Sequence, residues 1–168
     1  MKILTVEKYN ALLESISQLT DQTYIAKYVS DNFEHAKEEA HHLILQNLEE
    51  ALTAYGYEVI KVQVEPQSWS SINGSIFFKY MDYKFYLAIK SNHEINLWNV
   101  TQMQDDDIIN KLHPADNVKY FREKGFKIVE TEIGRIDKIS DIKIGVTQSI
   151  QNKQKALPAV QHRNIFDQ

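Results

Sequence analysis

The sequence contains no cysteine, and its 168 residues include only three prolines and five glycines. Without cysteine there is no disulfide framework, no thiolate metal site and no cysteine nucleophile. The five glycines form no glycine-rich phosphate loop, and neither Gly-x-Ser-x-Gly nor His-Glu-x-x-His occurs. A site assembled from residues distant in the sequence would leave no such signature, but from these absences we expect no catalytic residues and no cofactor.

Long hydrophobic runs are lacking as well. No apolar run reaches the roughly 20 residues that span a bilayer, and the N-terminus lacks the apolar core of a signal peptide. We therefore expect a cytoplasmic protein without a membrane partner. The net charge of -4 argues against general electrostatic binding to nucleic acid. Residues 1–56 contain nine acidic residues and only four lysines, so the N-terminal part is the acidic end of the chain.

The periodicity that is present predicts a single α+β domain over residues 1–168, with 157–168 as a flexible tail. We expect two N-terminal helices packed on an antiparallel meander of four or five strands, with additional C-terminal helices. Thr5 suits the N-cap of the first helix. Asp31 with Glu34 reads as a capping box, which predicts a second helix that ends at Gly56.

Alternation in residues 57–64 predicts a strand, with Ile60, Val62 and Val64 on one side. A short helix is expected at Asp105, after Thr101 as a possible N-cap. The sequence further predicts elements at three ranges: a helix over 116–124, a strand over 126–133 and a weak helix over 136–157.

Residues 74–100 predict three consecutive antiparallel strands. A turn at 81–84 would place Tyr80 opposite Phe85, Phe78 opposite Leu87 and Ile76 opposite Ile89. A turn at 91–93 would place Ile89 opposite Ile95 and Leu87 opposite Leu97. One face then becomes almost wholly apolar. Its residues are Ile76, Phe78, Tyr80, Phe85, Leu87, Ile89, Ile95 and Leu97.

The opposite face carries aromatic rings rimmed by lysines, with Tyr86 across from Trp98. This composition is typical of a base-stacking platform and equally of a protein-binding hot spot. It also fits a sheet face that the chain covers with its own helix. The candidate partner-binding residues are Phe77, Lys79, Lys84, Tyr86, Lys90 and Trp98.

Three groups of side chains have metal-binding character, and for each another interpretation is favoured. Glu39 and His42 have the spacing of di-iron helix ligands, but His35, Glu38, Glu39, His41 and His42 lie mostly away from the apolar stripe of their predicted helix. Residues 105–107 offer oxygen ligands, yet better suit the start of a helix. Glu65 with Asp82 and Lys84 faintly resembles a metal-dependent nuclease pattern. We predict no metal site.

These observations favour a non-catalytic protein-binding module with a protein partner. Small cytosolic antagonists, such as toxin immunity proteins or enzyme inhibitors, have this character. The alternative is a nucleic-acid-binding or Mg²⁺-dependent nucleic-acid-processing protein that uses the lysine-rimmed aromatic face.

Overall fold

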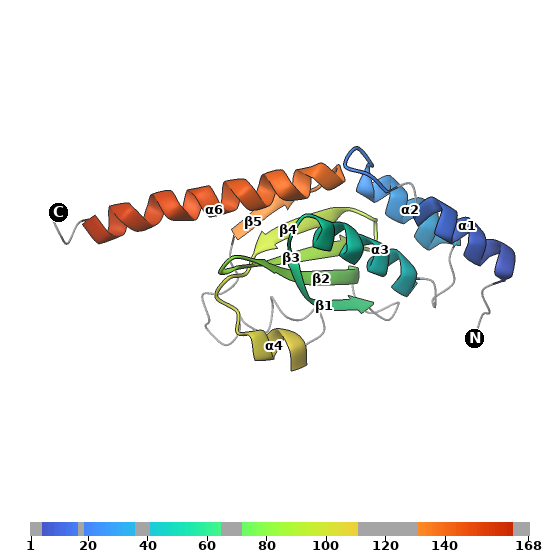
Figure 1. Cartoon of the computed structure of the whole chain (residues 1–168), viewed down its shortest axis with the longest axis horizontal. Coiled ribbons are helices and arrows are strands. Elements are labelled where there is room, and N and C mark those ends of the chain that lie inside the picture. The colour runs from blue at the N-terminus through green and yellow to red at the C-terminus, as the bar shows by residue number, and fades with distance from the viewer. Residues whose placement is uncertain (1–4, 17–18, 36–40, 65–71, 111–130, 163–168) are drawn as a thin grey trace.

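The computed structural model describes residues 5–16, 19–35, 41–64, 72–110 and 131–162. These residues form an α+β fold around one antiparallel sheet of five strands in the order β1-β2-β3-β4-β5, as the sequence predicted (Figure 1). The elements follow one another as α1 (Val6–Ile16), α2 (Ile25–His35), α3 (His41–Ala54), β1 (Glu58–Val64), β2 (Ile72–Tyr80), β3 (Tyr83–Lys90), β4 (Ile95–Asn99), α4 (Asp105–Asn110), β5 (Thr131–Arg135) and α6 (Ile139–His162).

The turn between β2 and β3 is tighter than the sequence predicted. Only Met81 and Asp82 separate the strands, and Met81 takes a positive φ of 57°. Phe78 therefore pairs with Phe85 and Ile76 with Leu87, so the predicted pairing was wrong by two residues. A shift of two residues keeps every side chain on its own face, because side chains alternate with a period of two.

The turn between β3 and β4 has the predicted register. Ile89 pairs with Ile95 and Leu87 with Leu97. The amide of Lys90 donates a 2.8 Å hydrogen bond to the carbonyl of Glu94, and His93 takes a positive φ of 67°. The three-residue turn between these strands is therefore confirmed.

The apolar face of the sheet, called here the core face, carries the main hydrophobic core. Its predicted residues are fully buried, with the exception of Tyr80 at the end of β2. Helices α3 and α6 lie on the same side of the sheet (Figure 1). They pack against it together with Ile25 and Val29 of α2. The buried residues of α3 and α6 are Ile44, Leu45, Leu48, Leu52, Ile139, Ile142, Val146 and Ile150.

Three helices precede the sheet, where the sequence predicted two. Asp31 does not cap a helix but lies inside α2, where it forms an ion pair with Lys27 one turn earlier. The buried stripe of Ile25, Val29 and Phe33 extends α2 back past Asp31, and this packing overrides the local capping signal. The predicted end of the following helix is confirmed, since Gly56 has a φ of 91° directly after α3.

Strand β1 contains a β-bulge that redistributes its side chains. The register against β2 shifts between Val59 and Lys61. Val59 and Val62 contact the main core, while Ile60 packs on the other side of the sheet. The prediction that Ile60 shares a side with Val62 was therefore wrong, because a bulge breaks the alternation.

Helix α6 is longer and packs more closely than the sequence indicated. It begins at Ile139 and continues through Pro158 to His162, beyond the predicted end at residue 157. Gly145 lies where a Cβ atom would approach Ile133 Cγ2 to 3.0 Å, so glycine lets the helix come close to β5. The predicted helix over 116–124 and most of the strand over 126–133 lie outside the described residues. The described end of that strand belongs to β5.

Candidate functional site

The face of the sheet opposite the core face, called here the aromatic face, holds a row of three rings. Phe77 of β2 stacks on Tyr86 of β3 with ring centroids 4.6 Å apart. Tyr86 pairs across the strands with Trp98, as predicted, at a centroid distance of 5.6 Å. Alternation along three neighbouring strands brings the rings together.

These rings belong to a second, smaller hydrophobic cluster. Phe77 and Tyr86 are each only 1% exposed, whereas Trp98 is half-buried. Val100, Met103 and Ile108 pack into the same cluster from the segment that leads into and forms α4. The sequence left open whether this face is an exposed binding surface or is covered by the chain itself. In the structure, the chain itself covers Phe77 and Tyr86. The partner-binding role of the six residues stays a prediction.

Two lysines on this face, Lys79 and Lys84, are held by α4. Lys84 Nζ lies 2.9 Å from Asp105 Oδ1, and Lys79 Nζ lies 3.7 Å from Asp105 Oδ2. Lys84 Nζ also donates a hydrogen bond to the carbonyl of Met103. The hydrogen bond and charge of Lys84, together with Lys79, lower the pKa of the Asp105 carboxyl. Asp105 therefore ties α4 to the sheet.

Lys90 lies at the other end of the aromatic face, in the last position of β3. Its side chain is half-buried. Thr101 does not serve as the helix N-cap, since α4 begins at Asp105. The Thr101 hydroxyl instead accepts a 3.2 Å hydrogen bond from the amide of Lys84 and donates to Asn99 Oδ1. The six predicted site residues thus share one face, but not one accessible surface.

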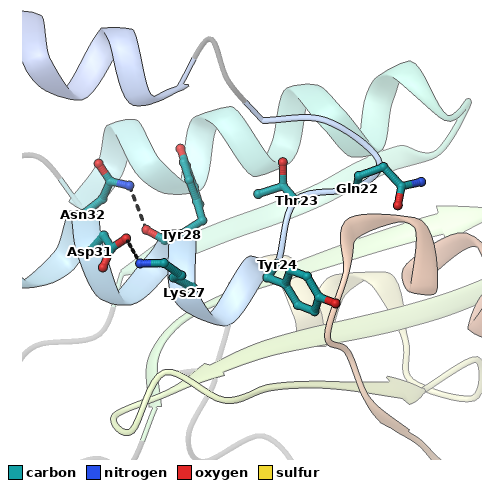
Figure 2. A pocket seen from close by; sticks show the side chains of 7 residues that line it. All are labelled: Gln22, Thr23, Tyr24, Lys27, Tyr28, Asp31 and Asn32. Atoms are coloured by element: carbon teal, nitrogen blue, oxygen red, sulfur yellow. Dashed lines mark hydrogen bonds and ion pairs between the residues drawn. The ribbon is translucent and has the colours of Figure 1, made fainter.

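A surface cavity of about 400 Å³ lies along the first turns of α2 (Figure 2). It is lined by Tyr24, which directly precedes α2, by Lys27, Tyr28, Asp31 and Asn32 of the helix, and by Gln22 and Thr23. The sequence analysis did not single out this cavity. The signal was present, because the first five residues follow the i, i+3, i+4, i+7, i+8 spacing of one helix face.

The floor of this cavity is fixed by hydrogen bonds to neighbouring elements. Asn47 of α3 donates a 3.0 Å hydrogen bond to the hydroxyl of Tyr28, and burial raises the pKa of Tyr28 to about 12. The Asn32 side-chain amide donates to the carbonyl of Tyr28 at 2.7 Å, as Figure 2 shows. Tyr28 and Asn32 are both buried, so this side of the cavity is rigidly positioned.

The outer rim of the cavity is exposed and charged. Tyr24 is 58% exposed, and Lys138 Nζ lies 5.1 Å from the centroid of its ring. Lys27 Nζ lies 2.8 Å from Asp31 Oδ2, and both side chains are largely exposed. The hydrogen bond to Asp31 raises the pKa of Lys27. The cavity thus combines a carboxylate, amide groups and the accessible ring of Tyr24.

No family, curated protein or solved structure matches this chain. The described helices include none with the length and apolar character needed to cross a bilayer. Function must therefore be argued from the residues themselves.

The side chains that the sequence analysis weighed as metal ligands lie in separate places, or outside the described residues. Among the described residues, no group of three or more His, Asp or Glu side chains is placed to hold a metal ion. His41 is buried and stacks on Phe33 with ring centroids 4.2 Å apart, and His42 is exposed. Glu38, Glu39 and Glu65 lie outside the described residues. Asp82 lies in the exposed turn between β2 and β3.

Proposed function

We propose that this protein is a non-catalytic binding module that captures a basic protein partner on the side formed by its N-terminal helices. It would act in the cytoplasm as a small antagonist of the toxin-immunity or enzyme-inhibitor type. The observation that carries this proposal is the α2 cavity within an acidic surface. Among the described side chains of α1, α2 and α3, the exposed carboxylates outnumber the one exposed lysine, Lys27, which is itself paired with Asp31. The exposed carboxylates are Glu7, Glu14, Asp31 and Glu50.

Charge complementarity is the physical basis of this choice of partner. Surfaces of opposite charge steer two proteins together and raise the rate of association, while like charges reject wrong partners. The charge imbalance of residues 1–56 in the sequence has the same sign as the described helical surface. A partner with a basic binding surface therefore fits this side of the molecule.

The aromatic face supports this proposal less directly. Phe77 and Tyr86 would reach a partner only if the segment from Val100 to Ile108 moved away. Lys79 and Lys84 are paired with Asp105, which reduces the positive charge available to a phosphate backbone. The alternative of nucleic-acid binding through this face is therefore not favoured.

The test is capture of a partner followed by reconstitution of the complex from purified proteins. We expect a one-to-one complex whose association slows as salt increases. The triple variant Glu7→Lys, Glu14→Lys, Glu50→Lys should weaken binding at least tenfold. A charge reversal at two exposed carboxylates away from these helices, Asp82 and Asp106, should leave binding unchanged.

Three results would count against the proposal. Equal loss of binding in both sets of variants would show that only net charge matters. If the protein binds oligonucleotides in a salt-dependent manner in a shift assay, with or without Mg²⁺, and captures no protein, the nucleic-acid alternative would be favoured. Turnover of a substrate by the purified protein without any stable complex would remove the idea of a binding module altogether.

A further inference from the structure

We propose that the α2 cavity receives an arginine side chain of the basic partner, an inference that rests on the proposed function. The cavity brings together three kinds of group that a guanidinium recognises. Asp31 supplies a carboxylate, Tyr24 an exposed ring, and Asn32 an amide carbonyl. Asp31 and Asn32 lie in α2 and Tyr24 directly precedes that helix, so the three residues line the cavity from one continuous segment of the chain (Figure 2).

The carboxylate of Asp31 is accessible to such a side chain. Its present partner, Lys27, lies on the same helix four residues earlier, and the two side chains are 57% and 77% exposed. Exposed ion pairs of this kind contribute little to stability, because water and salt screen them. An incoming cation can therefore displace Lys27 at a small cost in free energy. It would then bind the Asp31 carboxylate, which already holds the Lys27 nitrogen at 2.8 Å.

The ring of Tyr24 already serves as a cation contact within the fold. Lys138, which precedes α6, places its Nζ 5.1 Å from the ring centroid, within the range of cation–π attraction. The backbone of Tyr24 is held in place, since it forms an isolated antiparallel bridge with Lys138. The ring is thus attached to a fixed point of the backbone beside the cavity.

Arginine fits this arrangement better than lysine. Its planar guanidinium carries five donors, so it can bind a carboxylate with two parallel hydrogen bonds and still reach an amide oxygen. The same plane stacks on an aromatic ring. The Asn32 amide nitrogen donates within the helix to the carbonyl of Tyr28, and among the described residues no donor is placed on Asn32 Oδ1. A metal ion fits less well, since the cavity lining includes only one carboxylate.

The test uses the full chain and three tripeptides in an NMR titration that follows the backbone amides. The probes are acetyl-Gly-Arg-Gly-amide, its lysine counterpart, and the counterpart with citrulline, which keeps the shape of arginine without the charge. We expect the arginine peptide to shift the amides of residues 22–32. The lysine peptide should bind at least threefold more weakly, and the citrulline peptide should bind at least tenfold more weakly.

Variants at exposed positions sharpen the test, because these changes leave the buried residues of α2 in place. Asp31→Asn should weaken the arginine peptide at least tenfold, and Tyr24→Ala about threefold. Lys27→Ala should strengthen it two- to threefold by removing the competing cation. Asp82→Asn, in a distant turn, is the matched control and should have no effect.

Several outcomes would overturn the inference: no shift in residues 22–32, equal binding of arginine and citrulline, or unchanged binding by Asp31→Asn. If a basic partner is captured but Tyr24→Ala and Asp31→Asn bind it normally, the cavity assignment fails and the proposed function stands. If no partner is captured, the proposed function fails, while the peptide titration still decides whether the cavity takes arginine.

Discussion

The two faces of the sheet are built from the same strands, yet they are covered in different ways. The core face is apolar throughout its centre and meets α3 and α6, together with Ile25 and Val29 of α2. The aromatic face mixes the Phe77, Tyr86 and Trp98 rings with buried polar residues, and α4 is tied to it by Asp105. Ser75 and Asn96 are the buried polar residues of this face.

This difference shows how far alternation determines structure. Alternation assigns each side chain to a face, but it does not say what will cover that face. The core face is apolar enough to require a cover in any fold. The aromatic face could have been left open, and it is closed by a short segment with a charged tether. We therefore expect the two faces to respond unequally to matched changes.

The largest contrast should come from removing neighbouring rings of β2. We expect Phe78→Ala to lower the free energy of unfolding by about 4 kcal/mol, because it leaves a cavity between well-packed helices and the sheet. Phe77→Ala should cost about 2 kcal/mol, since the short α4 segment can settle into the space. Urea denaturation of both variants measures the difference. Equal losses would show that α4 is as firmly packed as α3.

Removal of the Asn99 side chain, which links β4 to α6 and to Thr101, should have the next largest effect on stability. Asn99 is fully buried; its amide donates to Ser149 Oγ of α6 at 2.8 Å, and its Oδ1 accepts from the Thr101 amide at 3.0 Å. We expect Asn99→Ala to cost about 2 to 3 kcal/mol, because Ser149 and Thr101 lose their hydrogen bonds to this buried side chain. Ser149→Ala, which removes one bond, should cost about 1 kcal/mol. A loss below that of Ser149→Ala would contradict this ranking.

Tyrosine ionisation should destabilise the core side at alkaline pH. Burial raises the pKa of both Tyr28 and Tyr57 to about 12. A raised pKa means that the native state favours the neutral phenol. The stabilisation is therefore complete below pH 10, the ordinary value, and is lost as the pH rises toward 12, by about 1 kcal/mol per ring at pH 11.

The measurement is the urea midpoint between pH 8 and pH 11.5. Tyr57→Phe should reduce the alkaline loss by its own share, and it keeps the ring that stacks on Phe78 at 5.1 Å. Tyr28→Phe should reduce the alkaline loss likewise, because burial raises the pKa of that phenol too. An unchanged alkaline loss in Tyr57→Phe would remove this tyrosine from the explanation.

The smallest effect is expected at the tether of the aromatic face. Asp105→Asn should lower stability by less than about 1 kcal/mol, because the carboxylate is half-exposed and screened by water. It should still loosen α4 and raise the quenching of Trp98 fluorescence by acrylamide, measured in a Trp69→Phe background. Asp106→Asn serves as the control. Because the pKa of Asp105 is lowered, the tether should persist to acidic pH and weaken as the pH falls through that value.

Much of the sheet could be predicted from the sequence, because its signals are local. The alternation of Ile89, Ile95 and Leu97 fixed both the face and the pairing at one turn. At the other turn, Tyr80 could face either Tyr83 or Phe85 without changing faces, and the structure has Tyr83. The helix boundary at Asp31 failed for a different reason. Burial of Val29 and Phe33 extends α2 beyond a capping signal that is only local.

The candidate sites were harder to predict, because they depend on what packs against them. The pairing of Tyr86 with Trp98 was predicted correctly, but their covering by Met103 and Ile108 is a tertiary contact that no local pattern reveals. The α2 cavity was missed, since a helix face of mixed tyrosine, lysine and aspartate reads as an ordinary solvated surface. The bond from Asn47 of α3 to Tyr28 is a tertiary contact that holds this helix face in place, and no local pattern reveals it.

The order of the strands has a consequence for how the chain folds. Strands β2, β3 and β4 are joined by short turns, so their pairing needs little loop closure and can form quickly. Strand β4 ends at Asn99 and β5 begins at Thr131, and the entropic cost of bringing two segments together rises with the length of chain between them. We therefore expect the central hairpins to form early, with β5 and the α6 helix that follows it adding last.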